Sequence, residues 1–256
     1  MSWLAGAPLE SGAWLLWCEV ALLGALLAMD ENSFVQTWLS QPLPAAVLAG
    51  LVLGEPAAGL LPGALMQLVV IGNLPVGASF RLDPASAAVG VTAGAVLAGW
   101  RAPVDLLARS TWSGGPAAEL GALLVLFAAA SVAGGRLVRL ERLARLGWML
   151  DGYRSVRDGD LARLERLHAR CLVTTALRGA ALALSIAVVV SLVWDPGLAL
   201  LSPRWRGALA LVPLAVPGLA VGTLLDRFGY RRSLALVGIG AAVGFLVATA
   251  AGQGVR

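Results

Sequence analysis

Residues 42–70 read PLPAAVLAGLVLGEPAAGLLPGALMQLVV. This run is almost wholly apolar, yet it is too long for one straight helix across a hydrocarbon core of roughly 30 Å. Gly54, Pro56 and Pro62 interrupt it. Interrupted backbone at membrane depth is tolerated only where protein or a cavity satisfies its polar groups. The run therefore predicts broken or re-entrant helices inside a membrane protein.

The rest of the chain is equally apolar. Of its 256 residues, 59% are hydrophobic and 13% are charged, and the mean hydropathy is +0.82. Soluble domains carry about 45–50% apolar and about 25% charged residues, and disordered chains are more polar still. Both classes are excluded. The composition predicts an all-α integral membrane protein, a polytopic helical bundle with broken or re-entrant helices in its first half.

The apolar runs divide the chain without indicating a second domain. We predict a single membrane domain over 1–256, with a first helical half over 14–135 that contains the interrupted helices. A polar loop over 136–170 follows, and then a second helical half over 171–251. The cleaner apolar runs inside these halves are 14–29, 85–99, 116–135, 171–194, 207–225 and 233–251. The segment 195–206, which contains two prolines, is expected to be a loop.

The charge is concentrated in the loop 136–170. All 19 basic residues of the chain are arginines, and this segment holds nine of them against five acids, which equals the whole net charge of +4. Because the loop lies between apolar runs, the positive-inside rule predicts that it is cytoplasmic, and no nucleic-acid partner is expected. Two interpretations of its structure stay open: a helix at the lipid interface, or helical extensions of the flanking spans.

Uncharged polar residues and acids gather around the interrupted region. Asp30 and Glu31 end the first apolar run, and amides and acids follow through the Gly- and Pro-rich part of the chain. Carboxylates and amides at broken helices suit a polyhydroxyl solute, because transporters bind substrates at such breaks. The competing interpretations are a water-exposed span end and interhelical hydrogen bonds. The predicted substrate-binding residues are Asp30, Gln36, Gln67, Asn73 and Asp83.

Signatures of catalysis are missing from the sequence. It contains no Walker A motif, no G-x-S-x-G and no H-E-x-x-H. The single histidine, His168, lies in the arginine-rich loop, and Cys18 and Cys171 have no metal-ligand spacing. We therefore expect no catalytic residue, no metal site and no cofactor.

Several blocks in this region resemble a known family. They are Asp30-Glu31, QTWLSQPL (36–43), GLVLGE (50–55), GALMQLVVIGNLPVGA (63–78) and DPASAA (83–88). Their order and spacing are similar to those of the membrane IIC components of the mannose/fructose/sorbose family of the phosphoenolpyruvate-dependent sugar phosphotransferase system. Glu55 stands where that family commonly has Asp.

The resemblance implies a function and a set of partners. It implies a IIC subunit that moves a hexose-type sugar across the bacterial inner membrane beside a IID membrane subunit. Soluble IIA and IIB phosphocarrier proteins would transfer the phosphoryl group, so the subunit would not itself be an enzyme. Its other contacts would be the sugar and membrane lipid. Two alternatives are a IIC-like regulator of a partial phosphotransferase pathway without transport, and an unrelated polytopic membrane enzyme.

Overall fold

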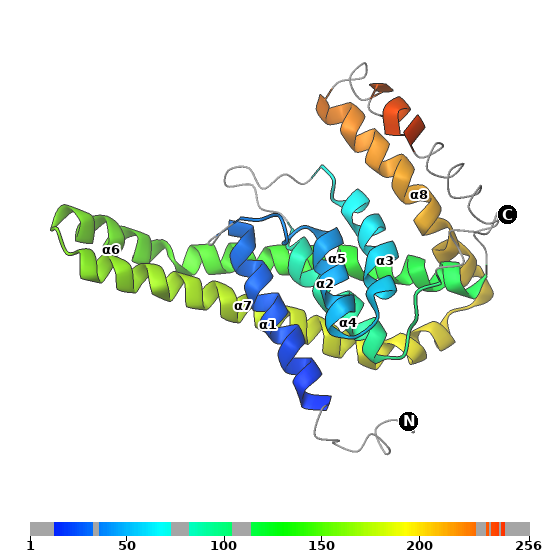
Figure 1. Cartoon of the computed structure of the whole chain (residues 1–256), viewed down its shortest axis with the longest axis horizontal. Helices are drawn as coiled ribbons and strands as arrows, with labels where there is room; N and C mark the ends of the chain where they lie inside the picture. Colours follow the sequence, from blue (N-terminus) through cyan, green and yellow to red (C-terminus); the bar gives the residue numbers. More distant parts are fainter. Residues whose placement is uncertain are drawn as a thin grey trace.

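The computed structural model describes residues 13–32, 36–72, 82–103, 114–228, 234–235, 237–240 and 242–243. In this part of the chain the regular structure is entirely helical, which confirms the all-α fold class (Figure 1). The helices are α1 (Ala13–Asn32), α2 (Pro42–Val52), α3 (Pro56–Val69), α4 (Pro84–Leu97), α5 (Gly115–Ala144), α6 (Leu146–Arg157), α7 (Leu161–Leu200) and α8 (Pro203–Phe228). Asn73 and most of the expected span 233–251 lie outside the described residues.

Two classes of apolar helix build the bundle. Among the described residues, three helices (α5, α7 and α8) are long and apolar enough to cross a membrane. By contrast α2, α3 and α4 have 11, 14 and 14 residues. At 1.5 Å per residue these are about 16–21 Å long, shorter than the roughly 30 Å hydrocarbon core. The prediction of interrupted helices in the first half is confirmed.

The apolar run 42–70 folds into two helices, each of which begins at a proline, whereas Pro62, expected to interrupt the run, lies inside α3. Pro42 opens α2 and Pro56 opens α3, where the missing backbone N–H would have no intrahelical partner anyway. Gly54, with φ +74°, forms the turn between them. At Gly59 the helices touch so closely that a Cβ would lie 2.1 Å from the carbonyl oxygen of Ala46. The two helices therefore lie side by side (Figure 1).

Helix α4 is the centre of the bundle. All its residues from Pro84 to Val96 are buried, and it packs against α1, α2, α5 and α7. Its small residues allow this close packing: a Cβ on Gly90 would lie 2.6 Å from the Cβ of Ile186, and one on Gly94 would lie 2.6 Å from the carbonyl oxygen of Ala187. Small residues at helix contacts are typical of membrane bundles.

Helix α1 crosses α7 at a second pair of glycines. A Cβ on Gly24 would lie 2.5 Å from the Cβ of Ala183, and one on Gly179 would lie 2.4 Å from the carbonyl oxygen of Gly24. The crossing fixes the C-terminal end of α1 beside α7. It thereby brings Asp30 and Glu31 to the polar region described below.

Two expected loops are helical. Helix α5 continues to Ala144, and α7 begins at Leu161, with α6 between them, so the interpretation of 136–170 as helical extensions holds in the structure. The expectation of a loop from residue 195 is wrong, because α7 continues through Pro196 to Leu200. Packing outweighs the hydrogen bond lost at this proline: Trp194 is buried edge-on against Trp100, with 6.3 Å between ring centroids.

Candidate functional site

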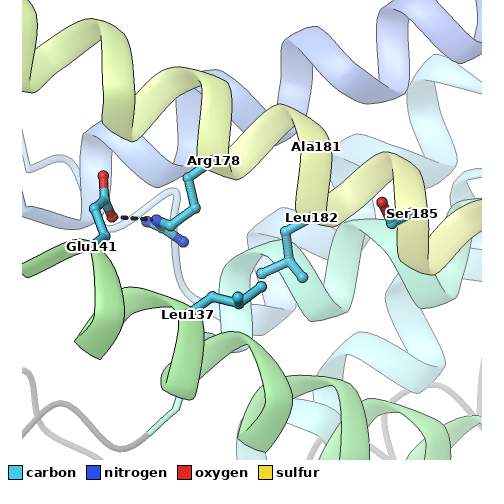
Figure 2. A pocket seen from close by; sticks show the side chains of 6 residues that line it. All are labelled: Leu137, Glu141, Arg178, Ala181, Leu182 and Ser185. Atoms are coloured by element: carbon cyan, nitrogen blue, oxygen red, sulfur yellow. Dashed lines mark hydrogen bonds and ion pairs between the residues drawn. The ribbon is translucent and has the colours of Figure 1, made fainter. Parts of the chain in front are cut away.

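Three charged side chains from three helices meet inside the bundle. Arg178 of α7 pairs through Nη1 with Asp83 Oδ2 at the start of α4, and its Nε donates to Glu141 Oε2 of α5 at 2.7 Å. Figure 2 shows the pair of Arg178 and Glu141 between α7 and α5. The side chain of Asp83 is fully buried and that of Arg178 is 10% exposed. Charges in such surroundings are costly unless they are paired, and these are.

Asp83 is held by more than the arginine. It caps α4, accepting from Ser86 N at Oδ1 (3.1 Å) and from Ser86 Oγ at Oδ2 (3.1 Å). Its backbone N–H donates to the carbonyl oxygen of Ser131 in α5 at 2.9 Å. A Cβ on Gly134 would lie 2.7 Å from the Cβ of Asp83, so this glycine leaves room for the carboxylate. Asp83 therefore fixes α4 against both α5 and α7.

A second arginine extends the cluster toward the start of α7. Arg145 pairs with Glu141 one helical turn earlier. Its Nη2 also donates to the carbonyl oxygen of Cys171 at 2.8 Å and to Thr175 Oγ1 at 2.9 Å. Glu141 therefore bridges two arginines. The end of α5 contacts α7 twice, through Glu141 with Arg178 and through Arg145 with Cys171 and Thr175.

The end of α1 adds a further carboxylate. Glu31 lies within electrostatic range of Asp83, Arg178 and Arg142. Its Oε2 is buried and has no hydrogen-bond partner among the described residues. With Glu141 and Arg145, three carboxyl groups and three guanidinium groups lie in this region. We call these six residues the ionic cluster: Glu31, Asp83, Glu141, Arg142, Arg145 and Arg178.

Asp30 faces a different part of the chain from its neighbour Glu31. Its Oδ1 accepts from Thr37 N at 2.6 Å and from Thr37 Oγ1 at 2.7 Å, and its Oδ2 accepts from Ser40 N at 3.1 Å. These bonds hold a turn in which Gln36 and Trp38 have positive φ angles of 57° and 71°. Asp30 thus shapes the segment that leads into α2.

Gln67 holds the same segment from the other side. Its Nε2 donates to Gln41 Oε1 at 3.1 Å, and its Oε1 accepts from Leu43 N at 3.4 Å. The N–H of Leu43 lies in the first turn of α2, where backbone donors lack intrahelical partners. Gln67 therefore joins the end of α3 to the beginning of α2.

The predicted site residues fall into two adjoining groups. Asp30 and Gln67 converge on the segment 37–43, which we call the α2 entry segment, and Gln36 is exposed just before it. Asp83 belongs to the ionic cluster, to which Asp30 is linked through the adjacent Glu31. Asn73 lies outside the described residues.

Sequence reasoning missed the cationic half of the cluster. Arg178 and Arg145 were not among the predicted residues, and neither was Glu141. A signal for Arg178 was present, because it is the one charged residue in the apolar run 171–194. An ionisable residue inside such a run usually faces the bundle interior and is paired there.

A pocket of about 280 Å³ opens between α5 and α7 beside this pair. Its lining is mostly apolar, with the ion pair of Glu141 and Arg178 at one end and Ser185 at the other (Figure 2). The pocket gives the ion pair access to the outside of the two helices. In the part of the chain that the structure describes, no group of three or more His, Cys, Asp or Glu side chains is arranged to hold a metal ion.

A second polar group lies around the last turn of α4, away from Asp83. Glu55, in the turn between α2 and α3, pairs with Arg101 just after α4, with Oε1 and Nε 2.9 Å apart. Beside it, Trp100 Nε1 donates to Glu119 Oε2 of α5 at 3.2 Å. These contacts connect the turn of the α2–α3 pair to α4 and α5. Glu55, which stands where the family commonly has Asp, therefore forms an ion pair between the α2–α3 turn and the segment that follows α4.

Long apolar helices, short interrupted ones and buried ion pairs together define a polytopic membrane protein of the transporter type. The family model of the sorbose-specific IIC component of the phosphotransferase system matches residues 15–240, and the chain belongs to this family. It is thus a sugar-translocating IIC subunit.

Two solved structures have the same fold. One, described as a membrane protein, has a TM-score of 0.65 and 18% identity, covering 94% of this chain and 92% of that one. The other is a chain from the cryo-EM structure of the mannose transporter ManYZ in complex with microcin E492, with a TM-score of 0.55 and 19% identity, covering 94% and 96%. No curated protein sequence matches the chain.

Proposed function

We propose that this IIC subunit moves a hexose-type sugar across the bacterial inner membrane together with a IID membrane subunit. In this proposal soluble IIA and IIB proteins carry the phosphoryl group and transfer it to the sugar. The IIC chain itself supplies the passage and transfers no phosphoryl group. Family membership supports the role, and the fold shared with a chain of a mannose transporter supports the partnership and the class of sugar.

The observation that carries the proposal is the meeting of short helices at the end of α1. There α2 begins, α3 ends and α4 begins, and amide, hydroxyl and carboxylate groups line these ends. Helix ends at a break leave backbone N–H and C=O groups available, which is how transporters hold polar solutes. We assign Asp30, Gln36, Gln67, Asn73 and Asp83 to the sugar pathway or its immediate support.

The contacts suggest different tasks for these residues. Gln67 has an amide that both donates and accepts in the α2 entry segment, so it can exchange its partner Gln41 for sugar hydroxyl groups. Asp30 accepts three hydrogen bonds from the turn at 37–40, so it supports the shape of the α2 entry segment. Asp83 is fully buried, so it acts by setting the position of α4.

The test is reconstitution with one component omitted at a time. Vesicles holding the chain and its IID partner, and loaded with phosphorylated IIA and with IIB, should accumulate sugar phosphate from external hexose. Omitting any one component should abolish accumulation. Full accumulation without IID would contradict the partnership, and failure of the complete set with every hexose would favour the regulatory alternative.

A further inference from the structure

One acid on helix α1 differs from the other charged residues of the apolar runs. In the described part of the chain these runs contain three charged residues, Glu19, Glu119 and Arg178. Glu119 accepts a hydrogen bond from Trp100, and Arg178 is paired inside the ionic cluster. Glu19 is exposed, and no described residue pairs with it. An ionisable residue in a membrane run usually faces protein and has a partner there.

Glu19 lies at the depth of the hydrocarbon core. Helix α1 crosses α7 where Gly24 meets Gly179. Gly179 is eight residues, or about 12 Å, into the apolar run of α7 that begins at residue 171. Glu19 is five residues from Gly24, so at most about 7.5 Å separates the levels of these two residues, whatever the tilt of α1. Glu19 therefore stays within an apolar layer of roughly 30 Å.

Glu19 belongs to a continuous exposed face of α1. Leu22 and Leu26 are 60% and 54% exposed, and Leu15 is also exposed. These positions follow one another at intervals of four, three and four residues, which places them in one stripe along the helix. The opposite side of α1 faces the bundle, where Val20 is buried. We call Leu15, Glu19, Leu22 and Leu26 the Glu19 face.

The Glu19 face borders a cleft that suits a helix. The cleft has a volume of about 260 Å³ and lies between α1 and the last turn of α2, lined by Glu19, Leu22, Leu23, Leu26 and Val52. Figure 1 shows the first turns of α1 projecting beyond α4 and α7. Alternating intervals of three and four residues are the spacing at which one helix receives the side chains of another. The face is therefore shaped for a further membrane helix.

The carboxylate selects among possible occupants. Acyl chains offer no hydrogen-bond donor, so lipid would leave a charged group unpaired in hydrocarbon. A second copy of this chain in a two-fold contact would set one Glu19 against the other. Within the described apolar runs its single basic residue is Arg178, which is already paired with Asp83 and Glu141. The occupant that fits is a helix of a different membrane protein with a donor at this depth.

We propose that the Glu19 face docks a membrane-spanning helix of the IID subunit, and that Glu19 pairs there with a basic or hydrogen-bond-donating side chain. This inference rests on the proposed function, in which IID is the membrane partner. Leu22 and Leu26 supply the apolar contact. Glu19 sets which helix binds and at which level, because another alignment would leave its charge unpaired.

Photo-crosslinking identifies what covers the face. The full-length chain is expressed with its IID subunit, and a photoreactive benzoylphenylalanine replaces Leu22 or Leu26. The matched control is the same label at Leu192, an exposed leucine of α7. Illumination of the membranes should join positions 22 and 26 to IID in far higher yield than position 192. Adducts with a second copy, with another part of the same chain or with lipid alone would overturn the proposal, and so would equal yields of IID adduct at all three positions.

Copurification tests the carboxylate itself. The native chain should retain IID in mild detergent, Glu19→Leu should retain roughly tenfold less, and Glu19→Gln should fall between them because an amide still accepts a hydrogen bond. Leu192→Ala is the control, and unchanged helix content by circular dichroism verifies folding. If even the native chain retained no IID, the partnership in the proposed function would fail. If Glu19→Leu retained as much IID as the native chain, the partnership would stand and this inference would be overturned.

Discussion

Arg178 connects residues that are far apart in the chain. Its partners Glu141 and Asp83 are 37 and 95 positions away, and each belongs to a different helix. Removing the guanidinium leaves two carboxylates in low-dielectric surroundings without their cation. The expected loss of folding stability is larger than for a surface ion pair. Breaking a buried ion pair leaves an uncompensated charge in the interior, whereas an exposed pair contributes little to stability.

We expect Arg178→Ala to lower the free energy of unfolding by roughly 3–5 kcal/mol, because it isolates two buried carboxylates. Arg178→Lys should recover part of this, since an ammonium group cannot reach both partners with the fixed geometry of a guanidinium. Thermal unfolding of the purified protein measures the loss. The matched control is Arg166→Ala, on the exposed part of the same helix. Equal losses for residues 166 and 178 would contradict the role of the cluster.

Gln67 is expected to affect transport more than folding. Gln67→Ala should lower sugar uptake per inserted molecule by a few-fold to about tenfold, because a lost hydrogen bond is worth about 0.5–1.5 kcal/mol. Leu60→Ala, at an exposed position of the same helix, should leave uptake unchanged. Uptake and membrane abundance are measured in the same cells. Normal uptake per molecule with reduced abundance would give Gln67 a purely structural role.

How far the site could be predicted depends on the range of each contact. Asp83 stood out because it is an acid within the Gly- and Pro-rich part of the chain, and Gln67 because an amide in an apolar run needs a partner. Arg178 was missed because its partners lie on other helices, where spacing in the sequence gives no register. Arg145 has the i, i+4 spacing to Glu141, but its contacts with Cys171 and Thr175 of α7 could not be predicted from spacing. Asp30 was found, but its use by the turn at 37–40 depends on backbone geometry that the sequence does not express.

At the level of helices, the prolines predicted the breaks only in part. Pro56 marks the start of α3, but Pro62, which was also expected to interrupt the apolar run, lies inside α3. Both interpretations of the arginine-rich segment 136–170 were helical, in keeping with arginine and leucine as good helix formers, and α6 gains further contacts against α7. At Pro196 the helix continues because Trp194 is packed against Trp100.

The contact of α4 with α7 depends on glycines. Gly90→Val should lower the melting temperature of the purified protein and reduce uptake, because the added side chain would overlap Ile186 and push apart the helices that carry Asp83 and Arg178. Overpacking of this kind costs about 1–3 kcal/mol. Gly197→Ala in α7, where no atom lies within 4 Å of the added Cβ, is the control. A melting temperature unchanged by Gly90→Val would contradict the close contact.

At the scale of the whole molecule, the placement of arginine predicts the orientation in the membrane. If 136–170 is cytoplasmic, then the ends of α1 and α5, the ionic cluster and the α2 entry segment lie toward the cytoplasmic side. This is the side on which a phosphoryl group would be transferred to an arriving sugar. The orientation stays a prediction from charge.

Cysteine labelling tests the orientation. Asp158→Cys, in the exposed turn between α6 and α7, should resist a membrane-impermeant thiol reagent in intact cells and react after the cells are opened. Ser155 is a poor position for this purpose because it is buried against α7. The native thiols are replaced by serine beforehand. Reaction of residue 158 from outside intact cells would invert the orientation.

Transport itself is the most direct measurement. Cells that lack their own hexose phosphotransferase uptake would receive the partner IIA, IIB and IID proteins with this chain, with its Arg178→Ala variant, or without it, and labelled sugar phosphate inside the cells would be measured. We predict rapid accumulation with the native chain, strongly reduced accumulation with the variant, and none without the chain. Accumulation that is the same with and without the chain would contradict its role as the sugar-translocating subunit.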